Sequence, residues 1–143
     1  MTKGQIMALA ACVGAPAAAQ SARLPIAEGV WVKLDTPCAS ATNLFVHAGK
    51  RFGSVYFYGP NQSMGPANET EALVKTGRGT SGFTMVNEGP IEVAARPNGR
   101  AVVRAFSPVQ GVAWSETVRL CPAASLPAKT RTALTRLRLL PAR

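Results

Sequence analysis

The chain has 143 residues, of which 47% are hydrophobic, and its formal net charge at pH 7 is +9. This length fits one folded domain, and apolar residues recur often enough to argue against disorder before residue 121. The single histidine excludes metal sites built from several imidazoles, so we expect neither a metal nor a cofactor.

Residues 1–19 have the features of a secretory signal peptide. Lys3 precedes an apolar run at residues 6–13, and the alanines at 17–19 provide a small-residue cleavage site. We therefore expect cleavage after Ala19 and a mature protein that is periplasmic or secreted.

A second cleavage signal overlaps the first. Leu9-Ala10-Ala11-Cys12 resembles a bacterial lipobox, so the alternative is a lipoprotein anchored through Cys12. Release is favoured, because the apolar stretch before Cys12 is shorter than an export signal normally needs. We expect a β domain over residues 20–121 and a basic tail over residues 122–143.

Two cysteines, Cys38 and Cys121, remain once Cys12 is cleaved off or lipidated. In the oxidising compartment to which the signal leads, a cysteine pair with no other sulfur ligands nearby favours a disulfide over a metal site. Cys38 follows the first predicted strand and Cys121 ends the last, so their bond would join the two ends of the sheet.

Short apolar runs between Gly29 and Cys121 alternate with Gly, Pro and Asn at the spacing of an all-β sandwich or barrel. The segment Pro97-Asn98-Gly99 is suited to a tight hairpin turn. We predict a small antiparallel fold of about eight strands, with residues 59–70 as an exposed loop. The predicted strands lie at residues 30–34, 43–48, 52–58, 71–75, 82–86, 91–96, 101–106 and 112–120.

The charged residues of the tail are all basic. Between residues 128 and 140 the apolar side chains fall on one helical face with arginines beside it, which predicts a basic amphipathic helix. Such a helix suits peripheral contact with a membrane, with another anionic envelope component or with a partner protein. The candidate contact residues are Lys129, Arg131, Leu134, Arg136, Leu137 and Arg138.

A glycine-rich segment, Gly77-Arg78-Gly79-Thr80-Ser81-Gly82, has the glycine spacing of a dinucleotide-binding loop. The phosphate-binding version lies between a strand and a helix, whereas a strand is predicted after this segment, so a hairpin loop is favoured. The alternative is an anion site of backbone N–H groups and basic side chains. Its candidate residues are Lys75, Gly77, Arg78 and Gly79.

No motif assigns a catalytic residue. His47 is expected to be a surface or pairing residue, since no motif nominates the titratable partners that a catalytic site needs.

Residues 52–59 carry more aromatic side chains than one face of a strand can bury. We favour a strand covered on both sides, with the C-terminal helix over one of them; the alternative is an aromatic surface that binds a sugar or a peptide.

The segments GVWVKLDTPCASATNLFVHAGKRFGS and TVRLCPAASLP resemble a group of small exported proteins of Gram-negative bacteria that have a cysteine pair and no assigned activity. The resemblance covers residues 24–127 and rests on Gly29-Val30-Trp31, Thr36-Pro37-Cys38 and Cys121-Pro122. It implies a periplasmic protein with a Cys38–Cys121 bond, and it implies no catalytic residue.

These features predict an envelope-associated binding module rather than an enzyme. The alternative function is inhibition of a secreted hydrolase, for which a small disulfide-closed β domain is a suitable scaffold, and a small hydrolase is the weakest of the three. Like charge argues against a basic target enzyme. We expect no nucleic-acid partner, because the positive charge of this exported chain is concentrated in its tail.

Overall fold

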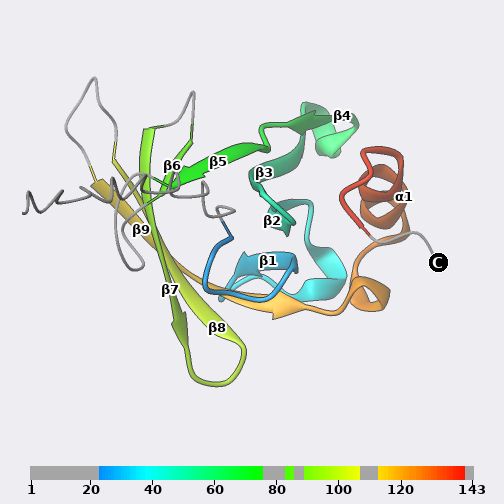
Figure 1. Ribbon diagram of the computed structural model, residues 1–143. Coiled ribbons are helices and arrows are strands. Elements are labelled where there is room, and N and C mark those ends of the chain that lie inside the picture. The colour runs from blue at the N-terminus through cyan, green and yellow to red at the C-terminus, as the bar shows by residue number, and fades with distance from the viewer. Residues whose placement is uncertain (1–22, 76–82, 86–88, 107–112, 141–143) are drawn as a thin grey trace, which may run out of the picture.

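The computed structural model describes residues 23–75, 83–85, 89–106 and 113–140. These residues form nine strands, one α-helix and three short 3₁₀ helices (Figure 1). The strands are β1 (Gly29–Lys33), β2 (Asn43–Ala48), β3 (Arg51–Tyr58), β4 (Met64–Asn68), β5 (Glu71–Lys75), β6 (Phe83–Met85), β7 (Gly89–Arg96), β8 (Arg100–Phe106) and β9 (Ala113–Cys121). The helices are η1 (Cys38–Ser40), η2 (Pro60–Gln62), η4 (Ala123–Ser125) and α1 (Ala128–Arg136).

All strand pairings are antiparallel and belong to one sheet, in the order β2-β1-β9-β8-β7-β6-β5-β3-β4, with a further pairing between β2 and β3. The sheet therefore curls back on itself. The ladder between β3 and β5 joins only two residue pairs, so the barrel is incompletely closed at this point. The predicted all-β antiparallel fold with a C-terminal helix is confirmed.

Two tight turns set the register of their hairpins. Gly49 has a φ of 60° in the two-residue connection between Ala48 and Arg51, which pair across β2 and β3. At the β7–β8 connection, Asn98 and Gly99 have φ values of 61° and 66°. Asparagine and glycine tolerate this left-handed backbone best, so the predicted Pro97-Asn98-Gly99 turn is confirmed.

Residues 59–70 are exposed for the most part, but they contain η2 and β4 and are not only a loop. β4 pairs with the second half of β3, where Tyr58 lies opposite Met64. It includes no β-branched or aromatic residue, so its sequence gives no strand signal. Pro66 is tolerated because β4 lies at the edge of the sheet and pairs on one side only.

Two apolar cores lie on opposite faces of β1, β2 and β3, because side chains alternate along a strand. The barrel core contains Leu24, Trp31, Phe52, Leu73, Ile91, Val93, Ala101, Val103, Ala105 and Val118. The second core lies between the barrel and the C-terminal segment and contains Val30, Val32, Ala41, Leu44, Val46, Val55, Cys121, Leu126, Leu134 and Leu139. Phe52 and Phe57 are both buried, whereas Tyr56 is partly exposed and Tyr58 is exposed, so the second half of β3 is covered on one face only.

Helix α1 ends at Arg136 rather than at residue 140, where the apolar periodicity ends. Arg138 has a φ of 56°, and the N–H of Leu139 donates to the carbonyl of Leu134, 2.9 Å away. This is the hydrogen-bond pattern of a Schellman motif, which reverses the chain and returns Leu139 to the core beside Leu134. The apolar residue at 139 therefore serves the helix cap and not a longer helix.

The predicted Cys38–Cys121 disulfide is present, with Cα atoms 5.8 Å apart. It joins the segment after β1 to the last residue of β9. Both cysteines belong to or pack against the second core, so the bond also fixes the point from which the chain runs on to α1.

Candidate functional site

The apolar stripe of α1 faces the barrel. Leu134 is 0% exposed in the second core, and Leu137 is partly buried against it. Leu134 is thus out of reach of a membrane or partner while α1 stays docked, whereas Leu137 keeps part of its surface accessible. The expectation that Leu134 would contact a membrane or partner does not fit this packing, because the second core already buries this side chain.

The basic residues of the same set divide into two groups. Arg131 donates hydrogen bonds of 3.0 Å to the carbonyls of Ala124 and Leu126, so it holds the turn that leads into the helix. Within the described part of the chain, the side chains of Arg136 and Arg138 make no hydrogen bond or ion pair, and both residues are exposed. These two guanidinium groups are therefore free to bind an anion.

Lys129 shares a feature with each group, because it contacts other residues of the protein, as Arg131 does, and is exposed, as Arg136 and Arg138 are. Its Nζ lies 4.1 Å from the centroid of the Phe57 ring, a cation–π contact, and donates to the carbonyl of Gln62. The residue as a whole is exposed.

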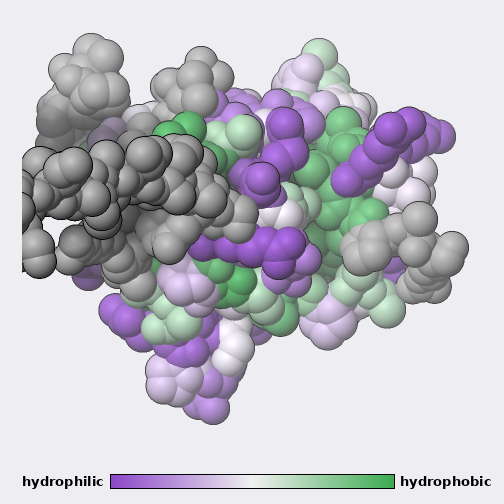
Figure 2. All heavy atoms as spheres, in the orientation of Figure 1, coloured by the Kyte–Doolittle hydropathy of each residue, from purple (hydrophilic) through white to green (hydrophobic). Residues whose placement is uncertain are grey.

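A groove of about 490 Å³ runs between α1 and the β3–β4 edge. Its sides are apolar at Phe57, Pro66 and Leu137, and its cations are Lys129 and Arg136. Figure 2 shows hydrophobic side chains gathered between β3 and α1, with hydrophilic ones beside them. The ion pairs found in the described residues, Lys33–Glu116 and Arg104–Glu92, lie on the barrel strands, so no acidic partner neutralises these helix cations there.

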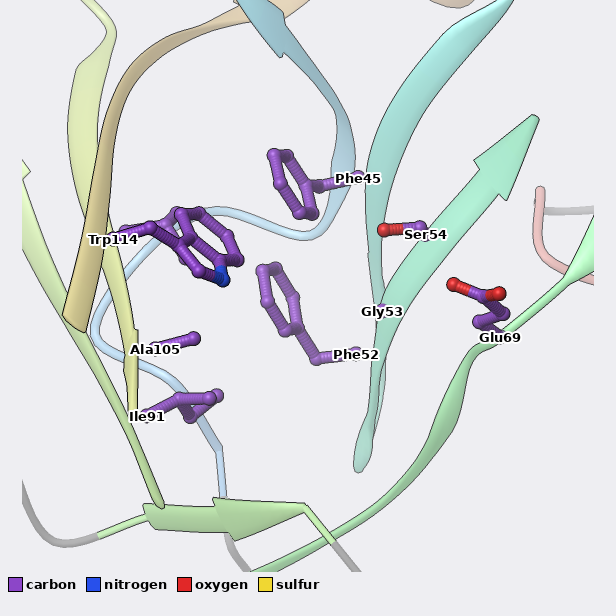
Figure 3. Close-up of a pocket in the computed structure, with 9 residues that line it drawn as sticks. Phe45, Phe52, Gly53, Ser54, Glu69, Ile91, Ala105 and Trp114 are labelled. Atoms are coloured by element: carbon purple, nitrogen blue, oxygen red, sulfur yellow. The ribbon is translucent and has the colours of Figure 1, made fainter. Parts of the chain in front are cut away.

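A second candidate site is a pocket at one mouth of the barrel, lined by three aromatic rings. The rings of Phe45 and Phe52 are nearly parallel, with centroids 5.8 Å apart and an interplanar angle of 5°. Phe45 also stacks on Trp114, at 5.9 Å and 19°. Figure 3 shows the three rings approaching one another from β2, β3 and β9.

The pocket has a volume of about 180 Å³ and is mostly apolar. The other lining residues are Ile91, Val103, Ala105, Gly53, Ser54 and Glu69. The Ser54 hydroxyl points to the side on which the rings lie (Figure 3). Trp114 lies opposite Ala105 in the β8–β9 ladder. Because alanine is small, the inner face of β8 leaves room beside the indole ring.

The aromatic pocket was not predicted. The alternation of β9 places Trp114 on the same face as Val118, which belongs to the barrel core. Val118 is indeed buried, whereas Trp114, near the start of β9, is 43% exposed. The sequence signal for this pocket would have been Trp114, an inward-facing aromatic residue near the end of a strand. This signal becomes informative only when the order of the strands in the sheet is known.

His47 is buried and not a surface residue, with only 2% of its surface exposed. Its Nδ1 lies 3.2 Å from the carbonyl oxygen of Ala27, which also accepts a 3.0 Å hydrogen bond from Trp31 Nε1. The buried rings of Trp31 and His47 therefore hold Ala27, which precedes β1, in place. This is a structural role for His47.

The exposed side of the β3–β4 edge holds one perturbed titratable group. The hydroxyl of Tyr56 donates a 2.8 Å hydrogen bond to the Glu69 carboxylate, and this bond together with the negative charge raises the pKa of the tyrosine above its ordinary value.

The candidate anion loop cannot be compared with the structure, because Gly77, Arg78 and Gly79 lie outside the described residues. Lys75 ends β5, and only its backbone is described. Among the described residues, His, Cys, Asp and Glu side chains do not form a group of three that could hold a metal ion.

None of the helices in the described residues has the length and apolar character needed to cross a bilayer. The chain matches no family model, and no curated protein or solved structure shows significant similarity to it.

Proposed function

We propose that the protein is an exported, envelope-associated binding module that holds an anionic lipid at the basic face of α1, which consists of Lys129 and Arg136 together with Arg138 just beyond the helix. The observation that carries this proposal is the exposed guanidinium group of Arg136, which lines the apolar groove together with Lys129. The exposed guanidinium group of Arg138 lies two residues further along the chain and lines a separate pocket with Glu28. Cations next to an apolar slot suit a ligand that combines a phosphate with a hydrocarbon chain.

Export is part of the proposal and has two supports. A disulfide such as Cys38–Cys121 is typical of proteins that fold in an oxidising compartment. The signal-like residues 1–19 would deliver the chain there. In a Gram-negative envelope such a protein would meet anionic lipid headgroups and lipopolysaccharide phosphates.

The packing of α1 sets the character of this binding. Since Leu134 is committed to the second core, the helix has little apolar surface left to insert into a bilayer. Attraction between cations and headgroups then dominates, at about 1 kcal/mol for each Lys or Arg near the surface. Binding of this kind is reversible and sensitive to salt.

Cosedimentation with lipid vesicles tests the proposal. We expect the purified protein to bind phosphatidylglycerol vesicles at low ionic strength and to leave phosphatidylcholine vesicles unbound. In about 1 M salt, where the Debye length is about 3 Å, binding should be lost. Equal binding to both vesicle types, or binding that survives the salt, would contradict an electrostatic lipid site. Retention by an acidic protein in place of anionic vesicles would identify a protein partner and also overturn it.

A further inference from the structure

We propose that the aromatic pocket at the barrel mouth binds a single uncharged, apolar ring. This inference is independent of the basic face of α1, because the pocket is formed by residues of β2, β3 and β7–β9 and by Glu69, and α1 lines no part of it. The bound group would be a phenyl-like ring, whether it belongs to a free small molecule or to an aromatic side chain of a peptide.

The size of the pocket limits the ligand to about one ring. Its volume of about 180 Å³ is slightly larger than the ~150 Å³ of an apolar protein cavity that accepts benzene. A benzene ring with one small substituent therefore fits, whereas a fused multi-ring ligand would extend out of the mouth.

The lining favours a ring without hydroxyl groups. Aromatic and aliphatic side chains form most of the wall, and among the described lining residues only Ser54 has a hydroxyl, which points to the ring side. In Figure 3 the Glu69 carboxylate lies on the other side of β3 from the rings. A sugar would bury several hydroxyls without partners, which is unfavourable, whereas a phenyl group loses no hydrogen bond on entering.

The stacked rings are already arranged for such a guest. Phe45 lies between Phe52 and Trp114, and both ring pairs have the centroid spacing of offset stacks. Trp114 keeps 43% of its surface exposed, so a ligand can contact the indole without displacing a core residue. The site thus needs little rearrangement before binding.

Three probes separate the possible ligands in a binding measurement by ligand-observed NMR. Benzyl alcohol carries one phenyl ring, N-acetyl-phenylalanine amide carries the same ring on a peptide backbone, and methyl glucoside carries a sugar ring. We expect the first two to bind and methyl glucoside not to bind. The tighter of the two phenyl probes then indicates whether the ring comes from a free molecule or from a peptide.

Matched variants locate the site. Trp114→Ala should weaken benzyl alcohol binding about tenfold, which is the loss expected from about 1.4 kcal/mol. Phe106→Ala is the control, since Phe106 is 42% exposed and lies on the neighbouring strand, next to the inward-facing Ala105 and on the opposite face. The Phe106→Ala variant should bind benzyl alcohol with the same affinity as the unmodified protein. Equal losses in the two variants, or binding of methyl glucoside in preference to benzyl alcohol, would overturn the proposal.

A variant that fills the pocket keeps the test valid if Trp114→Ala disturbs the fold. Ala105→Leu leaves all three rings in place and occupies the space beside the indole. It should abolish benzyl alcohol binding while the protein stays folded by circular dichroism. Undiminished binding to a folded Ala105→Leu protein would place the ligand elsewhere.

Discussion

The Thr130 hydroxyl donates a 3.0 Å hydrogen bond to the carbonyl oxygen of Ala41, across 89 positions of the chain. Thr130 is 1% exposed and Ala41 is fully buried, so this bond lies inside the second core. It ties α1 to the segment that connects η1 to β2. The C-terminal helix is therefore a component of the folded domain and not an appended tail.

Thr130→Val should lower the free energy of unfolding by about 1–3 kcal/mol. Valine keeps the shape of threonine but leaves the buried Ala41 carbonyl without its donor. Urea unfolding followed by circular dichroism measures the loss. The matched control is Thr132→Val, the same change at an exposed position of the same helix, which should alter stability by less than about 0.5 kcal/mol. Similar values for the two variants would mean that the hydrogen bond does not contribute.

Leu134→Ala should cost about 2–5 kcal/mol, because it removes a fully buried side chain and leaves a cavity between α1 and the barrel. The same substitution at Leu120, which is exposed on β9, should cost about 1 kcal/mol or less. Calorimetric or urea unfolding checks both values. If α1 were only loosely attached, Leu134→Ala would cost no more than Leu120→Ala.

Removal of the disulfide by Cys38→Ser with Cys121→Ser should destabilise the protein by about 4 kcal/mol. The bond closes a loop of 83 positions and so restricts the unfolded chain. The comparison is between oxidised protein and the double variant in urea. Equal stability would show that the native state gains nothing from the bond.

The hydrogen bond between Tyr56 and Glu69 predicts a measurable pH effect. The pKa of Tyr56 is raised, so its contribution to stability is present below the ordinary tyrosine value of about 10 and is lost as the pH rises through the higher folded value. In a Tyr58→Phe background Tyr56 is the only tyrosine, and its absorbance at alkaline pH reports the titration.

Adding Glu69→Gln to that background should move the titration to lower pH, because the carboxylate charge that opposes ionisation is removed. Glu92→Gln, on the separate strand β7, serves as the control and should leave the titration in place. A titration that does not respond to Glu69→Gln would mean that the hydrogen bond does not form in solution.

Much of the fold could be predicted because its signals are local. The alternation at Ile91 and Val93 and the turn at Asn98-Gly99 are sufficient to place β7 and β8. β4 could not be predicted, because its residues lack strand propensity and it exists only by pairing with β3. The early end of α1 depends on the return of Leu139 to the core, which is a tertiary contact.

The candidate sites were less predictable than the strands. The cations of α1 are visible in the sequence, but the division between a buried Leu134 and an exposed Arg136 depends on which face meets the barrel. The aromatic pocket combines Phe45 with Trp114, which lie far apart in the chain and meet only through the order of the strands.

Charge-matched variants on anionic vesicles test the proposed function most directly. Arg136→Gln with Arg138→Gln removes the two exposed guanidinium groups that make no hydrogen bond or ion pair within the described residues, of which Arg136 lines the groove. Arg96→Gln with Arg100→Gln removes the same charge at the end of the β7–β8 hairpin, which lies away from α1 (Figure 1). We predict that the first pair weakens binding to phosphatidylglycerol vesicles by about 2 kcal/mol, or roughly thirtyfold, and that the second pair has a much smaller effect. Equal weakening by the two pairs would show that only net charge matters and would contradict a lipid site on α1.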